Sequence, residues 1–598
     1  MRTRPDGRAT WRTWLDDLAQ DLRFGARSAR RAPLFTILAV VTIALGIGVN
    51  AAVFGVVKSV LLDALPYDGA SRLVRVYAMH QDSVFGRTPL SAGQAADIAQ
   101  RARTLARVAS FRQGTIDQTY VGGDGAQIVA TATVGDGFFG TLGVRAALGR
   151  ALTTADFAPN AQAVAVLGYD AWQRLFAGDR AVIGRAVRLD GSPYVVVGVL
   201  PRRFVGPMGG ADFWVPLDLR PFLRNPIGER RLRMLGLVGR LAPTATADAA
   251  QREVAAIARD LAREHPEADG SFSLSSLPLR DDMVGDTRRP LVVVMASAAL
   301  VLLIACANLA GALLSRTVTR RREFAVRAAI GAGGGRIVRQ LLTESTMLAL
   351  VGGLTGVVLA ELGLRVVRAF ARGALPAYAV VSLDGGVLVF AFALTVLTGV
   401  AFGLAPALSV TRSGARNALQ EATRGATEGR GSRQLRGLLV AGQIALSLSL
   451  LAGAGLLGRS LWELTTLPLG FDPQGVLTLP VRLSARDYRT LDARARFYDQ
   501  LEERLRTLPG VSGVATTTAL PTPVMGKIEF KIDGVVWPTG AQPVANVAAV
   551  SDDYFRTMRI ALREGRTFGP EERTDSVVSV VVSQAMAHRF WPNGRAVG

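Results

Sequence analysis

The 598-residue chain has 69 lysines and arginines against 48 aspartates and glutamates, a formal net charge of +21, and 49% of its residues are hydrophobic. This length exceeds what one hydrophobic core organises, so several units are expected. The single cysteine, Cys306, excludes a disulfide or a cysteine metal site within one chain. The arginines cluster beside apolar runs instead of forming one basic face, which indicates membrane topology and argues against a nucleic-acid partner.

The N-terminal residues 1–33 hold eight arginines and an apolar face at helical spacing, made by Trp11, Trp14, Leu15, Leu18 and Leu22. A basic amphipathic helix of this kind lies in the membrane interface, so residues 1–33 are predicted to be a cytoplasmic helix that contacts membrane lipid on the inner leaflet. The alternative is a solvated, partly disordered basic tail.

Residues 34–62 form the first predicted span, because an apolar helix of this length crosses about 30 Å of hydrocarbon. No small-residue cleavage site follows it, so it is expected to remain uncleaved. With the arginines inside, the chain reaches the outer face at about Asp63. Gly46, Gly48 and Asn50 lie in mid-span and predict close helix packing, with a polar pathway through Asn50 as the alternative.

Residues 64–289 are predicted to be a large α+β outer domain. Runs typical of strands lie at residues 127–134, 163–167, 186–189 and 194–199, and runs typical of helices at 137–142, 171–176 and 247–263. His80 and His265 stand alone and are expected at the surface. The chain contains no H-E-x-x-H, G-x-S-x-G or S-x-x-K pattern, so no catalytic residue is predicted.

Four further spans follow, at residues 291–314, 346–369, 387–409 and 438–461, and 411–436 is a polar cytoplasmic linker. Gly352 and Gly356 in the third span form a G-x-x-x-G pattern, which predicts a close helix-packing face. Glu361 near the outer end of that span is a nominal functional candidate. Its neighbour Arg365 favours an ion pair at the membrane interface instead. Residues 464–598 begin a second outer domain.

Between the second and third spans, residues 316–344 carry seven arginines against only Glu323 and Glu344. A cationic segment between two spans lies on the cytoplasmic side. Apolar residues at helical spacing over 324–330 predict a short surface helix, and the glycine run at 331–335 is expected to end it. The simplest alternative is a lipid-facing basic loop that only sets topology.

The chain repeats itself at a spacing of about 400 residues. The sequence DGFFGTLGVRAALGR at residues 136–150 is matched by DDYFRTMRIALREGR at 552–566, and residues 163–176 are echoed at 578–591. The predicted architecture is therefore duplicated: one span, an outer domain and three spans, with the second copy incomplete. On this pattern the chain is expected to be a fragment of a protein of roughly 800 or more residues.

The basic segment resembles the cytoplasmic coupling segment of MacB/FtsX-type ABC transporter permeases. The family pattern R-x-E-[IF]-[AG]-[IV]-R-x-A-[LI]-G-A, followed by Q-L-L-x-E, is matched at Arg321, Glu323, Phe324, Arg327, Gly331, Ala332, Gln340 and Glu344. Residues 135–156 are similar to the signature of the MacB-type periplasmic core domain, and residues 290–412 to an FtsX-like permease domain. Residues 21–54 resemble the duplicated, ADOP-type branch.

The resemblance implies a membrane α-helical bundle with large α+β periplasmic domains, in a bacterial inner membrane, with the N-terminus cytoplasmic. It implies a dimeric cytoplasmic ABC ATP-binding subunit that binds ATP and Mg²⁺ and drives export or mechanical work on the periplasmic domains. A periplasmic adaptor or an outer-membrane component is a further possible partner, and a duplicated chain would act as its own pseudo-dimer. The chain itself lacks G-x-x-x-x-G-K-[ST], so it is expected to bind no cofactor and to be no enzyme.

Two other classes of function stay open from the sequence. One is a membrane-anchored sensory or structural protein whose outer domain binds a ligand without any ATPase. The other is a membrane-tethered hydrolase, against which the missing nucleophile and metal motifs count. The substrate is not defined by any motif.

Overall fold

The computed structural model divides into two compact units, residues 1–64 with 283–463 and residues 65–282 with 464–598. Each is described by itself. The described residues are 20, 23, 25–27, 29–63, 65–80, 86–122, 125–224, 229–319, 334–370, 378–412, 430–481, 483, 488, 490–521, 526–537, 543–569, 572, 579–592 and 594–597.

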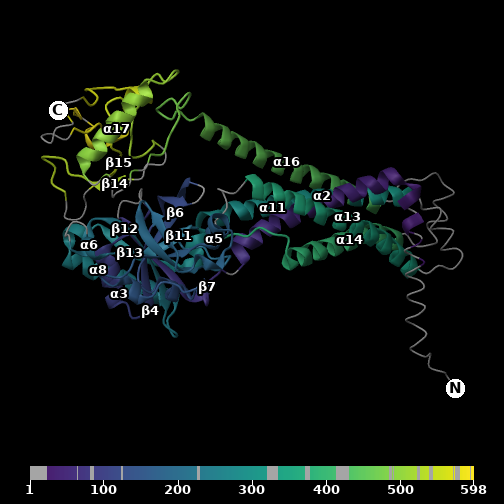
Figure 1. Ribbon diagram of the computed structural model, residues 1–598. Coiled ribbons are helices and arrows are strands. Elements are labelled where there is room, and N and C mark those ends of the chain that lie inside the picture. The colour runs from purple at the N-terminus through teal and green to yellow at the C-terminus, as the bar shows by residue number, and fades with distance from the viewer. Residues whose placement is uncertain are drawn as a thin grey trace. The chain divides into compact units, whose positions relative to one another are not determined.

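The first unit is built from long apolar helices. They are α2 (Pro33–Val57), which continues as a π-helical turn (Lys58–Leu62), α11 (Arg288–Thr319), α13 (Gly334–Phe370), α14 (Gly385–Arg412) and α16 (Arg430–Thr466). Within the described residues, five helices are long and apolar enough to cross a membrane. Figure 1 shows α2, α11, α13 and α14 running alongside one another, and we call these four helices the span bundle.

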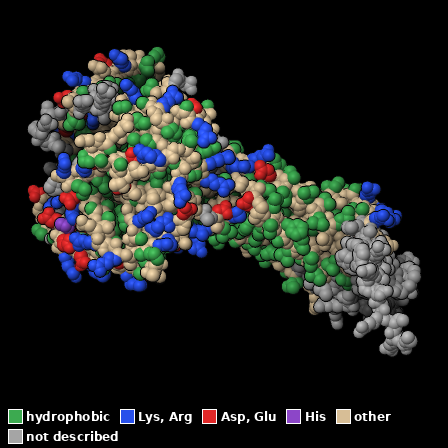
Figure 2. All heavy atoms as spheres, turned by 60° about the horizontal axis from the view of Figure 1, so that its bottom comes forward, with side chains coloured by type: hydrophobic (Ala, Val, Ile, Leu, Met, Phe, Trp, Pro, Cys, Tyr) green, Lys and Arg blue, Asp and Glu red, His purple; other side chains and the backbone are tan. Residues whose placement is uncertain are grey.

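The span bundle is apolar on its outside as well as in its centre. Leu38, Leu354 and Phe392 are each more than 60% exposed, whereas Ile47, Ala349 and Ala360 are fully buried. Figure 2 shows hydrophobic side chains covering the visible face of these helices. A helix that is hydrophobic all round suits a lipid environment, since only lipid tails solvate its outer face without cost.

Two helix boundaries differ from the sequence prediction. The helix α13 already includes Gly334 and Gly335, so it begins within the glycine run 331–335 and before the predicted third span. The helix α16 begins at Arg430, inside the predicted polar linker. Both helices extend past their apolar runs because backbone hydrogen bonding continues through polar residues at the membrane interface. The helix predicted over 324–330 lies outside the described residues.

The first outer domain has one 13-stranded sheet with the path β11-β8-β10-β9-β5-β6-β4-β12-β1-β13. One part of the sheet is a layer covered by helices α3 (Ala92–Arg101) and α8 (Ala247–Glu264). Ala250, Val254 and Leu261 form the buried stripe of α8 against that layer. The strands of this layer are β1 (Leu73–His80), β2 (Arg87–Thr88), β3 (Leu90–Ser91), β4 (Leu105–Arg112), β12 (Arg233–Leu241) and β13 (Phe272–Pro278).

The other part of the sheet closes on itself. The strand β11 pairs with β8 on one side and with β6 on the other, so β11, β8, β10, β9, β5 and β6 form a ring. Phe213, Leu167 and Val196 fill its interior. Closure removes exposed strand edges. The ring strands are β5 (Ile116–Gly122), β6 (Gly125–Val134), β8 (Val164–Leu167), β9 (Ala186–Leu189), β10 (Ser192–Val199) with its short partner β7 (Leu148–Gly149), and β11 (Phe213–Pro216).

The strands and helices predicted from the sequence in this domain are confirmed, with ends that shift by up to two residues. The prediction that His80 lies at the surface is wrong. His80 is 8% exposed and its ring packs against Phe272 with the centroids 5.0 Å apart. It is the last residue of β1, where the strand pairs with β13, so the sheet itself buries it.

The second outer region contains α17 (Leu491–Arg506), β14 (Gly526–Glu529), β15 (Val544–Val547), α18 (Tyr554–Thr557) and α19 (Gln584–Phe590). One local structure occurs in both outer regions. Gly143 after α4 (Phe138–Leu142) and Arg559 after α18 both have positive φ, 71° and 52°. This conformation favours glycine, so an arginine in it marks a geometry that the surrounding fold maintains.

Each of these two segments is also followed by an ion pair of its own, at the matching position of the repeat. Arg150 contacts Asp156 at 2.6 Å, and Arg566 contacts Glu572 at 2.6 Å. Each carboxylate also accepts a 2.7 Å bond from a backbone N–H three residues earlier in the chain. The same arrangement of an ion pair and a backbone hydrogen bond therefore occurs at two positions 416 residues apart.

Candidate functional site

The predicted coupling segment lies between the C-terminal end of α11 and the N-terminal end of α13. Arg321, Glu323, Phe324, Arg327, Gly331 and Ala332 lie outside the described residues. Gln340 and Glu344 lie on the first turns of α13, where the Gln340 amide donates to the Glu344 carboxylate at 3.2 Å. The structure thus places the second half of the pattern on the third span itself.

The residues around this segment lie where the ends of three helices come close together. The Arg316 guanidinium, near the end of α11, lies 4.8 Å from the centre of the Phe35 ring at the start of α2. A Cβ atom on Gly25 would lie 3.3 Å from Met347 Sδ and 3.7 Å from Glu344 Cγ, both on α13. The N-terminal segment therefore passes close to the helix that carries Gln340 and Glu344.

The glycines of α2 and α13 form a close backbone contact between these two helices. A Cβ atom on Gly48 would meet the carbonyl oxygen of Gly356 at 2.9 Å, and one on Gly356 would meet the carbonyl oxygen of Ala44 at 3.0 Å. A Cβ on Gly352 would meet Ile43 Cγ2 at 2.6 Å. Backbone lies against backbone here, which only small residues allow.

Gly46 and Asn50 face a different helix. A Cβ on Gly46 would meet Leu302 Cδ1 of α11 at 2.9 Å. The Asn50 amide, 3% exposed, donates to the carbonyl oxygens of Gly46 at 2.8 Å and of Ala298 at 2.9 Å. Asn50 therefore hydrogen-bonds α2 to α11, as the packing interpretation of this residue expects.

The ion pair predicted at Glu361 is present. Its carboxylate accepts from Arg365 at 3.0 Å and from Arg368 at 2.8 Å, one and two turns along α13. The two arginines are 68% and 43% exposed and Glu361 is 32% exposed, so the pairs contribute little to stability.

Sequence reasoning missed a cluster at the C-terminal end of α2. The Lys58 ammonium contacts the Asp63 and Asp384 carboxylates, each at 2.6 Å. Asp384 also caps α14, because its carboxylate accepts from the Val387 N–H at 3.0 Å. These ion pairs join the C-terminal end of α2 to the N-terminal end of α14. One signal was in the sequence: Lys58 is one of only three lysines among 69 basic residues, and it ends an apolar span.

Lys58→Met is expected to lower the free energy of unfolding of the span bundle by about 1 kcal/mol, because it leaves two carboxylates facing each other. The value is small since Asp63 and Asp384 are 43% and 41% exposed. Thermal unfolding in lipid nanodiscs at low and high salt measures it. Lys58→Arg is the matched control and should behave like the wild type. A double variant with Asp384→Asn should recover stability; an additive loss would contradict the ion cluster.

The comparisons with known proteins find two matching family models. The model of the MacB-like periplasmic core domain matches residues 36–257, and that of the FtsX-like permease C-terminal domain matches residues 295–415.

Relatives match over parts of their length. The pyoverdine export ATP-binding/permease protein PvdT of Pseudomonas syringae pv. syringae (strain B728a) is 31% identical over 42% of this chain and 37% of its own. The macrolide export ATP-binding/permease protein MacB of Bordetella avium (strain 197N) is 28% identical over 67% of this chain and 60% of its own. The chain thus spans less than two thirds of either relative. The periplasmic region of MacB from Actinobacillus actinomycetemcomitans has 15% identity and a TM-score of 0.27, over 38% of this chain and 94% of its own.

Proposed function

We propose, from the membership of this chain in the MacB/FtsX-type family of ABC transporter permeases, that it is the transmembrane subunit of an ABC system. A cytoplasmic ATP-binding subunit, acting as a dimer, docks on the coupling segment and drives motion of the periplasmic domains. The observation that carries this proposal is the FtsX-like match over residues 295–415, which contains the coupling pattern, most of α11 and all of α13 and α14.

The packing of the span bundle supports transmission of force. A push on the coupling segment acts first on α13, whose inner turns carry Gln340 and Glu344. The helix α13 lies backbone to backbone on α2 through Gly48 and Gly356, so the two helices move as one body. The helix α2 leads directly into the first outer domain after Asp63. Motion at the inner face therefore reaches that domain along a rigid element.

The orientation follows from charge. Arginines before α2 and between α11 and α13 outnumber those at the outer helix ends, which favours a cytoplasmic N-terminus in the inner membrane. The basic segment with Glu323 in its midst would present mixed charge to a partner, which suits docking in a specific groove.

ATP is proposed to bind to the separate subunit together with Mg²⁺. The 598 residues contain no phosphate-binding loop, and Gly526–Lys527 lacks both the preceding glycine and the following hydroxyl residue. The two relatives differ in this respect, because each is named an ATP-binding/permease protein, which combines both activities in one protein.

We infer export or mechanical work on the outer face as the output, with a periplasmic adaptor or outer-membrane component as a further partner.

A duplicated chain fits this role, because two copies would supply both halves of a pseudo-dimer. The equivalent ion pairs Arg150–Asp156 and Arg566–Glu572 support two copies of one outer domain. The equivalent positive-φ residues Gly143 and Arg559 support it independently. The helix α16 would then be the counterpart of α2. A Cβ atom added at its glycines 442, 453, 455 or 458 would meet no atom of the described residues within 4 Å.

Purification of the full-length protein in mild detergent from its native host, with identification of co-purifying proteins and an assay of ATP hydrolysis, tests the proposed function. We expect a stoichiometric ATP-binding subunit whose hydrolysis rate depends on the permease. A clean preparation without any ATPase, repeated after crosslinking, would contradict the proposal and favour a membrane-anchored sensory or structural protein.

A further inference from the structure

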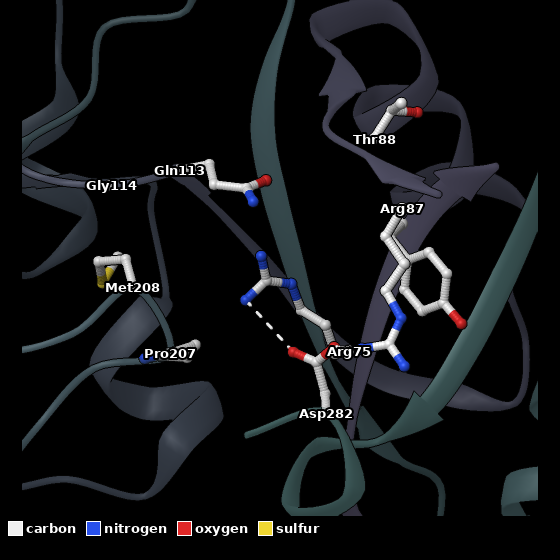
Figure 3. A pocket seen from close by; sticks show the side chains of 9 residues that line it. Arg75, Arg87, Thr88, Gln113, Gly114, Pro207, Met208 and Asp282 are labelled. Atoms are coloured by element: carbon white, nitrogen blue, oxygen red, sulfur yellow. Dashed lines mark hydrogen bonds and ion pairs between the residues drawn. The ribbon is translucent and has the colours of Figure 1, made fainter. Parts of the chain in front are cut away.

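A cavity of about 440 Å³ lies within the first outer domain. Its charged walls are Arg75 on β1, Arg87 on β2 and Asp282 on α10 (Leu279–Val284). Figure 3 shows the Arg75 guanidinium directed into the space between Gln113, Met208 and Asp282. The volume falls in the range of small-molecule sites, and none of these residues belongs to the coupling segment or the span bundle.

Arg75 is a buried cation whose charge and hydrogen-bond donors are only partly satisfied by its neighbours. Its side chain is 8% exposed, and among the described residues its Nε atom has no hydrogen-bond partner. Its ion pair with Asp282 is long, with Nη1 3.9 Å from Oδ2, and its guanidinium stacks 4.5 Å from the centre of the Phe111 ring. Burial lowers the pKa of Arg75, against which the Asp282 carboxylate acts. A buried charge without full hydrogen bonding is costly, so the burial of Arg75 lowers the stability of the fold.

Arg87 makes the shorter of the two contacts with the Asp282 carboxylate. Its Nη1 lies 2.8 Å from Asp282 Oδ1, and its guanidinium lies 5.1 Å from the centre of the Tyr77 ring. Two guanidinium groups therefore face one carboxylate, which leaves these three residues of the wall with one net positive charge. Met208 and the ring of Tyr77 make other parts of the wall apolar.

We propose that this cavity binds a small molecule with one carboxylate on an apolar body. The carboxylate accepts hydrogen bonds from Arg75 and Arg87, whose forked donors match its two oxygens. The apolar body lies against Tyr77 and Met208. One net positive charge favours a monoanion, because a dianionic phosphate would bring a second negative charge beside Asp282.

The geometry makes Asp282 a competitor of the ligand. It occupies the donors of Arg87 and faces Arg75, so an incoming carboxylate must displace it or share the two arginines with it. Removal of the Asp282 charge therefore strengthens binding, whereas removal of the Arg87 charge weakens it. Opposite effects of two neutralising substitutions in one cavity distinguish a carboxylate site from an apolar one.

The test uses the full chain in nanodiscs, with benzoate as the probe and saturation-transfer NMR or calorimetry as the measurement. We expect saturable benzoate binding, and none for benzyl alcohol or inorganic phosphate. Arg87→Gln should weaken benzoate binding about tenfold and Asp282→Asn should tighten it about tenfold, the size of one charge-assisted hydrogen bond. Asp281→Asn, the exposed neighbour on α10, and Arg252→Gln, an exposed arginine on α8, are matched controls and should not change it.

Several results would overturn the proposal. Equal binding of benzyl alcohol would make the cavity merely apolar, and binding of inorganic phosphate would make it a general anion site. Absence of benzoate binding in both the wild type and Asp282→Asn would remove the site altogether. Thermal unfolding of each variant checks that it is folded. Benzoate binding does not depend on ATP hydrolysis. Absence of benzoate binding would therefore not contradict the proposed permease function, and absence of a partner ATPase would not contradict the carboxylate site.

Discussion

Gly356→Leu is expected to lower the free energy of unfolding of the span bundle by about 3 kcal/mol. The Cβ atom alone would lie 3.0 Å from the carbonyl oxygen of Ala44 and 3.2 Å from the backbone nitrogen of Gly48. Backbone atoms of a packed helix cannot rotate away as a flexible side chain does, so α2 and α13 must separate. Separation also removes the contacts between Gly352 and Ile43 one turn away.

The measurement is thermal unfolding of the purified protein in nanodiscs, together with its yield in the membrane fraction. Gly311→Leu is the matched control: it adds the same side chain within the spanning helix α11, where a Cβ would meet nothing within 4 Å. Gly356→Ala should give an intermediate loss of stability, because its Cβ atom makes the same close contacts but carries no further side-chain atoms. A wild-type yield and melting profile for Gly356→Leu would show that this contact does not hold the bundle together.

This contact illustrates what a sequence can predict in such a chain. The G-x-x-x-G spacing identified a small-residue face on α13, because helical periodicity alone places Gly352 and Gly356 on one side. The spacing did not identify α2 as the partner, nor that Gly48 lies opposite Gly356. Faces are local properties of a helix, whereas the choice of partner depends on how all the helices pack.

The outer domain shows the same limit. Its strands were predictable from runs such as 163–167 and 186–189, since β-branched residues and turn signals are local. The closure of the ring depends on pairing β11 with β6, which lie about 80 residues apart, and no local pattern encodes that register. The cavity around Arg75 and Asp282 joins residues more than 200 positions apart. Arginines and aspartates are too common in this chain for such a pair to stand out.

The predicted coupling segment differs from the cavity and the strand ring, because its proposed role could be inferred from the sequence alone. Its residues form an ordered motif within one stretch of chain, so the spacing of Arg321, Glu323 and Arg327 is specific without any knowledge of the fold. The structure adds the position of the flanking residues. Arg316 contacts Phe35 on α2, and Gln340 and Glu344 lie on α13, so both ends of the segment join the span bundle.

Arg321→Glu with Arg327→Glu is expected to abolish permease-dependent stimulation of ATP hydrolysis, a loss of tenfold or more. In the proposed docking, each reversal would replace an attraction to the ATP-binding subunit by a repulsion, and close charge pairs at interfaces are worth about 1.5 kcal/mol or more each. Arg321 and Arg327 belong to the part of the pattern that is predicted to lie in the cytoplasm between two spans, so the variant should still insert and melt like the wild type. ATP hydrolysis with the purified partner subunit, measured beside thermal unfolding, separates docking from folding.

The matched control for this variant is Arg416→Glu with Arg424→Glu, which makes the same change of charge in the predicted cytoplasmic linker but outside the coupling pattern. If the basic residues only set topology, both double variants should lower membrane insertion similarly and neither should change the stimulation per inserted molecule. If the segment docks, only the first variant loses stimulation while remaining inserted. Unchanged stimulation in a correctly inserted Arg321→Glu, Arg327→Glu protein would exclude these two arginines from docking, and the coupling would then have to act through Phe324 or the first turns of α13.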